Sequence, residues 1–149
     1  MSVDRGKKQK ESVFLERKRF KKTFIPLSAL QKRPLTILEA VITYLKEETA
    51  LSYRELATLI NRDERNVRDV YLKAQKKSIK QEKQTTTIII PVSIFTNRIL
   101  SPLEVLVTYL KEVHSLTYHE LAVLLKRNDR TIWTVYQRAR KKNMKREMK

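Results

Sequence analysis

The sequence predicts an all-α protein made of two copies of one small unit. Residues 24–77 align without a gap onto residues 89–142, an offset of 65 positions, and 25 of the 54 aligned pairs are identical. Each copy carries apolar residues at helical spacing, and the chain contains a single Gly and four Pro, so few residues interrupt helices. We therefore expect two tandem three-helix units, each with a marginal core of its own because each is small.

An extended segment precedes the helices in both copies. The Ile-Pro pair at residues 25–26 recurs at residues 90–91, where a run of threonine and isoleucine comes before it. β-Branched residues favour strands, and proline is tolerated only in an edge strand. We expect the two segments to pair, either within one chain or between two chains. In the second case the segment that begins at Ile88 and ends at Phe95 would form a homodimer.

The first helix of each unit is predicted to begin at a capping box. Thr36 and Glu39 stand three residues apart, as do Ser101 and Glu104. In this pattern the hydroxyl accepts from an early backbone N–H and the carboxylate accepts from the N-cap N–H. Pro102 fits the first helical position, where no N–H is needed. Apolar residues then recur at i, i+3, i+4 and i+7, which gives each helix one apolar stripe.

The second and third helices of each unit are separated by a very short turn. Capping-box sequences at residues 52–55 and 117–120 start the second helix, and Asp63 and Asn128 are favourable N-caps for the third. Asn61 in the first turn tolerates a left-handed backbone conformation, whereas the second copy has Lys126 at this position. This predicts two helix-turn-helix domains, each preceded by a short extended segment.

In each copy a small Ala is followed by a turn residue four positions later and by branched apolar residues ten and thirteen positions later. With the segment Leu-Ser/Thr-Tyr-x-Glu-Leu-Ala and a closing Ala-x-Lys-Lys, this pattern resembles the region-4-type helix-turn-helix of sigma factors and small prokaryotic DNA-binding proteins. The resemblance covers residues 36–77 and 101–142. It implies that the third helix of each unit enters the major groove of DNA while the preceding helix crosses the backbone.

The outward and N-terminal residues of each third helix are candidates for contact with base edges. Arg65 and Arg130 occupy the same position, where a guanidinium pairs with guanine; a surface salt bridge is the alternative role for both. Trp133 stands where the first copy has Arg68, and a contact with another protein or with the core is its alternative role. The base-edge candidates are Arg65, Asn66, Arg68, Asp69, Arg130, Thr131, Trp133, Thr134 and Gln137.

Basic and hydroxyl side chains around these helices are candidates for contact with DNA phosphates. The basic side chains at the end of each third helix also suit the negative end of the helix dipole, which is the alternative explanation for them. The phosphate candidates are Ser52, Tyr53, Arg62, Lys73, Lys76, Lys77, Thr117, Tyr118, Arg127, Arg138, Arg140, Lys141 and Lys142.

Positive charge is spread along the chain and favours a polyanionic partner. The net charge is +17, with +6 in residues 1–23, +4 in residues 24–83 and +7 in residues 84–149. We divide the chain into a basic arm (1–23), a first unit (24–77), a linker (78–87), a second unit (88–142) and a basic tail (143–149). Fully extended, the linker spans about 33 Å, close to the roughly 34 Å between successive major grooves on one face of a duplex.

The composition argues against an enzyme. There is no cysteine, the two histidines lack counterparts in the first copy, and there is no Gly-rich phosphate loop. We expect no catalytic residues, metal, cofactor, small-molecule substrate or membrane segment. The expected partner is double-stranded DNA, in the cytoplasm on the nucleoid. A sequence-reading transcription regulator is favoured; the alternatives are an architectural nucleoid protein that coats or bridges DNA and, with less support, an RNA-binding module.

Overall fold

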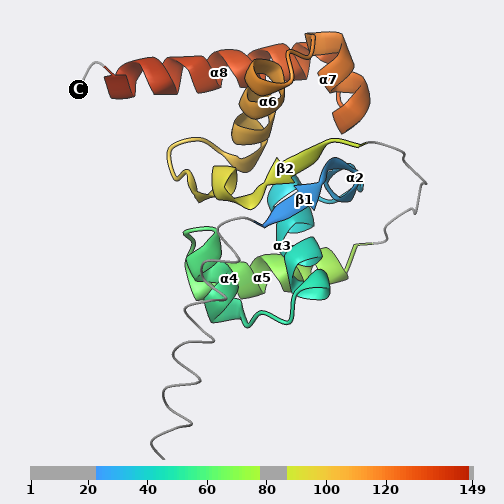
Figure 1. The fold of residues 1–149 in the computed structure, drawn as a ribbon, viewed down its shortest axis with the longest axis vertical. Coiled ribbons are helices and arrows are strands. Elements are labelled where there is room, and N and C mark those ends of the chain that lie inside the picture. The colour runs from blue at the N-terminus through green and yellow to red at the C-terminus, as the bar shows by residue number, and fades with distance from the viewer. Residues whose placement is uncertain (1–22, 78–86, 148–149) are drawn as a thin grey trace, which may run out of the picture.

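The chain folds into two helical groups with a two-stranded sheet between them (Figure 1). The computed structural model describes residues 23–77 and 87–147, so most of the predicted N-terminal arm and linker and the last two residues of the tail lie outside the described residues. The first copy consists of β1 (Phe24–Pro26), α2 (Leu27–Leu30), α3 (Ile37–Glu48), α4 (Tyr53–Leu59) and α5 (Glu64–Gln75). The second copy consists of β2 (Ile89–Pro91), the 3-10 helix η1 (Val92–Thr96), α6 (Pro102–Val113), α7 (Tyr118–Leu125) and α8 (Asp129–Glu147).

The all-α class is confirmed, and the predicted capping boxes start the first helices. Thr36 Oγ1 accepts from Glu39 N at 3.2 Å, and Glu39 Oε1 accepts from Thr36 N at 3.0 Å. Ser101 and Glu104 make the same two bonds at the start of α6, with Pro102 at the first helical position. The sequence predicts an extended segment around each Ile-Pro pair, but the chain turns into α2 and η1 directly after the proline, which stands in extended conformation at the N-cap of each.

The two strands pair in a register that is unchanged when the two copies are exchanged. Ile25 lies opposite Ile90, its own counterpart at the 65-residue offset, in an antiparallel pair. The other pairs exchange into one another in the same way. The full register is Phe24 with Pro91, Ile25 with Ile90 and Pro26 with Ile89. An antiparallel pair of equivalent strands with this register has an approximate two-fold axis at its centre.

The backbone hydrogen bonds beside the sheet follow the same symmetry. Leu27 N donates to Ile88 O and Val92 N donates to Thr23 O, both at 2.9 Å. Strand pairing between the copies therefore occurs within one chain, which is one of the two arrangements that the sequence predicts. A homodimer through the segment from Ile88 to Phe95 stays a prediction.

Both copies share one hydrophobic core. The buried residues form a single cluster that includes Ile25, Ile42 and Leu56 of the first copy and Ile90 and Leu106 of the second. The expectation of two separate cores is wrong, because the sheet and the contact between α3 and α6 bring the apolar sides of both copies together. Packing two small units against each other buries apolar surface that each alone would leave in water.

A buried carboxylate on the first helix of each copy pairs with a lysine, which lies on α8 in the second copy and two residues after the end of α5 in the first. Lys77 Nζ lies 2.6 Å from Glu39 Oε1, and Lys142 Nζ lies 2.8 Å from Glu104 Oε1, while the two glutamate side chains are 7% and 8% exposed. Burial raises the pKa of Glu39, but hydrogen bonds from Lys77 and from Thr36 outweigh burial and hold its pKa below the usual value. Glu104 is affected in the same direction by burial, Lys142 and its own capping serine.

The last helix extends beyond its predicted end. α8 runs to Glu147, so residues 143–147, which the sequence assigns to a tail, are helical. These residues are Asn, Met, Lys, Arg and Glu, none of which terminates a helix as Gly or Pro does. No helix among the described residues is both long and apolar enough to cross a membrane.

We predict that Ile90→Ala destabilises both copies together. Ile90 is fully buried in the shared core, and removing a buried isoleucine side chain costs about 2–4 kcal/mol. Hydrogen exchange in mild denaturant should speed up in α3–α5 as well as in α6–α8. Val123→Ala is the control, since Val123 is 64% exposed. Faster exchange confined to the second copy would contradict the shared core.

We predict that Lys77→Met lowers stability at pH 7 by about 1–3 kcal/mol, because it leaves the buried Glu39 carboxylate without its partner. In the folded protein the pKa of Glu39 lies below its usual 4.5. The ionised carboxylate therefore contributes its full stabilisation of the fold well above pH 4.5, and this stabilisation is lost as the pH falls through the folded pKa. The destabilisation, measured by urea unfolding, should therefore shrink towards pH 4.

Lys142→Met should behave like Lys77→Met, since it breaks the equivalent pair. Lys76→Met is the control, because Lys76 is exposed beside Lys77. Equal destabilisation by Lys77→Met at pH 7 and pH 4 would rule out the charged pair as the cause.

Candidate nucleic-acid interface

Short turns of the same geometry join α4 to α5 and α7 to α8. Asn61 has φ 56° and Lys126 has φ 55°, so both lie in the left-handed region. The following backbone N–H, of Arg62 or Arg127, donates to the carbonyl of the alanine five residues earlier, at 2.8 and 2.9 Å. Lysine thus adopts at the second turn the conformation that the sequence predicts for asparagine at the first.

Side-chain caps fix the first turn of α5 and of α8. Asp63 Oδ1 accepts from Arg65 N at 2.7 Å, and Asn128 Oδ1 accepts from Thr131 N at 2.7 Å. Each acceptor satisfies a backbone donor that the helix itself leaves free. The N-terminal residues of both helices are therefore held at defined positions at the surface.

A tyrosine–lysine cluster holds the three helices of each copy together. The rings of Tyr53 on α4 and Tyr71 on α5 have centroids 6.0 Å apart, and Lys46 Nζ on α3 lies 4.4 Å from the Tyr53 centroid. The second copy repeats the arrangement, with distances of 6.0 and 4.1 Å around Tyr118. Tyr53 and Tyr118, both phosphate candidates, thus have a packing role that fixes the third helix.

The base-edge candidates lie along the accessible sides of α5 and α8. Neither Arg65 nor Arg130 makes an ion pair with a described residue; a salt bridge forms instead between Arg68 and Glu64 at 3.7 Å. Trp133 is 52% exposed. Exposed candidates are Arg65, Asn66, Arg68, Asp69, Arg130 and Trp133, and half-buried ones are Thr131, Thr134 and Gln137.

The phosphate candidates divide into free and committed side chains. Lys77 and Lys142 each pair with a buried glutamate, so their charges serve the fold and we leave them out of the phosphate set proposed below. The exposed candidates are Ser52, Lys73, Lys76, Thr117, Arg138, Arg140 and Lys141. The half-buried ones are Tyr53, Arg62, Lys77, Tyr118, Arg127 and Lys142.

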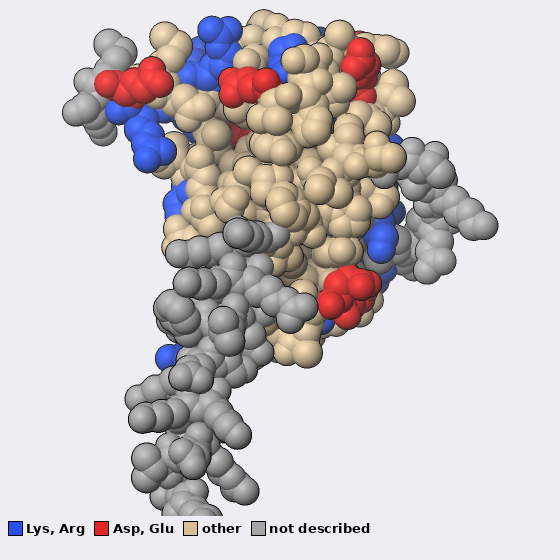
Figure 2. Space-filling view, viewed as in Figure 1, with Lys and Arg blue, Asp and Glu red and all other residues tan. Residues whose placement is uncertain are grey.

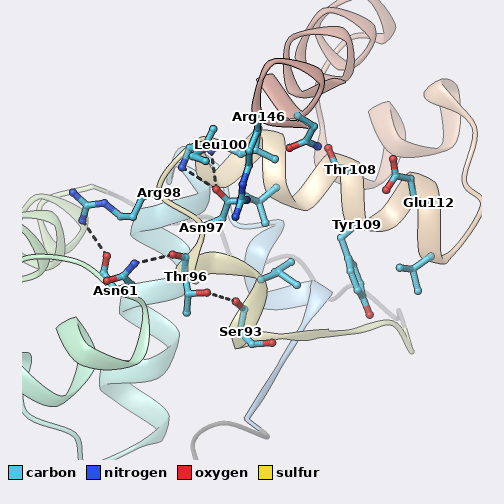
Figure 3. A pocket seen from close by; sticks show the side chains of 15 residues that line it. Asn61, Ser93, Thr96, Asn97, Arg98, Leu100, Thr108, Tyr109, Glu112 and Arg146 are labelled. Carbon is cyan, nitrogen blue, oxygen red and sulfur yellow. Dashed lines mark hydrogen bonds between the residues drawn. The ribbon is translucent and has the colours of Figure 1, made fainter. Parts of the chain in front are cut away.

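The second and third helices of each copy, with the turn between them, pack against the segment that precedes the first helix of the other copy. Asn61 Nδ2 donates to Thr96 O at 3.1 Å, and Arg98 Nη1 donates to Asn61 O at 3.0 Å (Figure 3). In the equivalent region related by the approximate two-fold axis, Gln31 Nε2 donates to Leu124 O at 2.7 Å. We call these two contact regions the seams: the first seam contains Asn61, Thr96 and Arg98, and the second seam contains Gln31 and Leu124. Each seam joins the segment just before the first helix of one copy to the helix pair of the other.

An arginine pair lies at each seam. Burial lowers the pKa of Arg62, and the charge of Arg98 lowers it further. Arg127 is affected in the same way by burial and by Arg33. Neither Arg33 nor Arg98 is among the candidate residues predicted from the sequence. Their signal was that both are identical at the 65-residue offset although neither belongs to an apolar stripe or a helix cap.

Beside the first seam lies an open cavity of about 660 Å³, between η1, α6 and the end of α8 (Figure 3). Its lining mixes apolar Ile99 and Val113 with charged Glu112 and Arg146. Among the described residues, no group of three or more His, Cys, Asp or Glu is placed to hold a metal ion. His119 Nδ1 instead lies 3.2 Å from Asp129 Oδ2, at the start of α8.

Charged side chains are unevenly distributed over the surface. On the face drawn in Figure 2, uncharged residues cover the middle, while Lys and Arg, with Asp and Glu among them, lie towards the end occupied by α8 and along the edges. The central part of this face is therefore not a basic surface.

Comparisons of the chain with protein-family models, with curated proteins and with solved structures return no match. The resemblance to the sigma region-4-type helix-turn-helix accordingly stays a prediction from the residues that carry it.

Proposed function

We propose that this protein binds double-stranded DNA through α5 and α8, with each helix in a major groove. The observation that carries the proposal is an exposed arginine, Arg65 or Arg130, at the second position of each of these helices and without an ion-pair partner among the described residues. A capped helix that follows a short turn is the element with which helix-turn-helix proteins read base edges. The net charge of +17 supplies the attraction that does not depend on sequence.

The symmetric pairing of β1 with β2 supports a specific geometry for the DNA site. If both helices contact one duplex, an approximate two-fold relation between the copies orients the two half-sites as an inverted repeat. Arg68 and Asp69 of α5 correspond to Trp133 and Thr134 of α8, so the two half-sites differ in base sequence. This difference favours a transcription regulator, which acts in the cytoplasm on the nucleoid.

A second candidate function is bridging of DNA by an architectural nucleoid protein. Figure 1 shows α5 and α8 on opposite sides of the sheet, separated along the long axis of the molecule. Helices separated in this way favour contact with two duplexes, one at each end. Both copies are basic, which supports binding to DNA backbones of any base sequence and so supports this role.

Selection from a randomised duplex pool at about 150 mM salt, with single-stranded RNA as competitor, distinguishes these functions. An enriched motif of two inverted half-sites supports the regulator. Binding without enrichment, together with capture of a second labelled duplex by an immobilised one, supports bridging. Preferential loss to the RNA competitor contradicts both DNA functions.

Substituting the two unpaired arginines tests the assigned base contacts. The double variant Arg65→Ala/Arg130→Ala should lose about 1–3 kcal/mol of discrimination per site between the selected and scrambled duplexes. Its affinity for scrambled DNA should change much less. Lys73→Ala is the control, because an exposed phosphate contact should weaken binding to both duplexes equally. An unchanged preference in the double variant would remove both arginines from the base-reading set.

Trp133 reports directly on α8 because it is the single tryptophan of the chain and is half exposed. We predict that saturating duplex DNA shifts or quenches its emission, since contact with DNA replaces the water around the indole. The signal should be absent in Trp133→Phe, whose affinity for DNA is measured in parallel by anisotropy of labelled DNA. Unchanged emission at saturation would place α8 away from the DNA.

A further inference from the structure

Four arginines form two equivalent pairs at the seams. At the first seam, Arg98 of the second copy donates to the carbonyl of Asn61, the residue before Arg62 of the first copy. At the second seam, the charge of Arg33 of the first copy lowers the pKa of Arg127 of the second. Arg98 and Arg127 are the counterparts of Arg33 and Arg62 at the 65-residue offset. Exchange of the copies therefore converts one pair into the other. Each pair exists only because the two copies pack together.

The geometry is clearest at the first seam. Arg98 Nη1 donates at 3.0 Å to the carbonyl of Asn61, the residue that precedes Arg62 (Figure 3). Arg62 Nε is buried without a hydrogen-bond acceptor among the described residues, and so is Arg127 Nε at the second seam. Arg98 and Arg33 are exposed, and Arg62 and Arg127 are half buried. Each pair thus combines a partly buried guanidinium with one that is open to solvent.

No carboxylate of the described residues compensates these charges. The ion pairs present elsewhere use Arg68, Lys77, His119 and Lys142, not the four seam arginines. The two positive charges of each pair repel each other, and an anion bound between them would offset this repulsion. The two copies differ at more than half of their aligned positions, yet both arginine positions are identical in both.

We propose that each seam pair, Arg62 with Arg98 and Arg127 with Arg33, is a composite phosphate-binding site that holds one backbone phosphate of duplex DNA. Guanidinium groups bind phosphate oxygens with paired, charge-assisted hydrogen bonds. This inference rests on the proposed DNA-binding function and extends it. In each site one arginine, Arg62 or Arg127, belongs to the copy whose third helix lies next to the phosphate, and the other, Arg98 or Arg33, comes from the other copy.

The position of each pair matches a phosphate at the edge of a major groove. Arg62 immediately precedes Asp63, the N-cap of α5, and stands three residues before Arg65. Arg127 precedes Asn128, the residue whose side chain caps the first turn of α8. Phosphate contacts of this kind fix the register of a DNA-reading helix on the duplex but carry no base preference. The seam pairs would therefore position Arg65 and Arg130.

The test measures how DNA affinity depends on salt. Each phosphate contact contributes about 0.9 to the slope of log K against log salt concentration. The variant Arg33→Gln/Arg98→Gln should therefore have a slope shallower by about 2, while its preference for the selected sequence is retained. Arg98→Lys, which keeps the charge, should retain most of the slope. Circular dichroism melts establish that each variant is folded.

Lys32→Gln is the matched control, because Lys32 is an exposed neighbour of Arg33 in the same loop and loses the same charge. If Lys32→Gln flattens the slope as much as Arg33→Gln does, general electrostatics explains the effect and the composite site is wrong. An unchanged slope in the double variant overturns it as well. Both outcomes leave the DNA-binding function standing, since the unsubstituted protein still binds.

A second measurement needs no DNA and separates phosphodiester from free phosphate. In inorganic phosphate, against chloride at matched ionic strength, the melting temperature of the unsubstituted protein should rise more than that of Arg33→Gln/Arg98→Gln. A rise without any DNA binding would keep the anion site and overturn the DNA-binding function. An equal rise in both proteins would overturn the site.

Discussion

The pairing of Ile25 with Ile90 is the contact on which the arrangement of both copies depends. Two equivalent strands in an antiparallel register centred on equivalent residues can be related only by an approximate two-fold axis. Once this axis is set, α3 meets α6, the apolar stripes of both copies merge into one core, and the helix pair of each copy meets the segment before the first helix of the other. Duplication of the short strand with the helices thus makes a small unit self-complementary.

Much of each copy could be predicted because the relevant interactions are local. A hydroxyl at Thr36 and a carboxylate three residues later specify a helix start without help from the rest of the fold, and the apolar stripe specifies which side is buried. The turn of the second copy was harder to predict, since Lys126 does not favour the left-handed conformation that it adopts. The same backbone hydrogen bond closes both turns, from Arg62 N to Ala57 O and from Arg127 N to Ala122 O.

The arrangement of one copy on the other, and with it half of the candidate site, could not be read from the sequence. Hydrogen bonds from Gln31 to Leu124 and from Arg98 to Asn61 join residues far apart in the chain through backbone carbonyls, which every residue has. Only the repeated identity of Arg33 and Arg98 marked them in the sequence. The end of α8 differs from the predicted one for another reason, because the repeat ends at Lys142 although no helix-breaking residue stands there.

The pattern of identity between the copies fits what each part of a duplex requires. Phosphates are the same in every sequence, and the seam arginines are the same in both copies. The outward faces of α5 and α8 differ at Arg68 and Trp133, and under the proposed function these faces would lie against base edges, which vary with sequence. Under the proposed function, identical seam arginines would serve any base sequence, while unlike outward faces would give each third helix its own base preference. A symmetric frame that carries two unlike helices would then fix the orientation of the protein on an asymmetric DNA site.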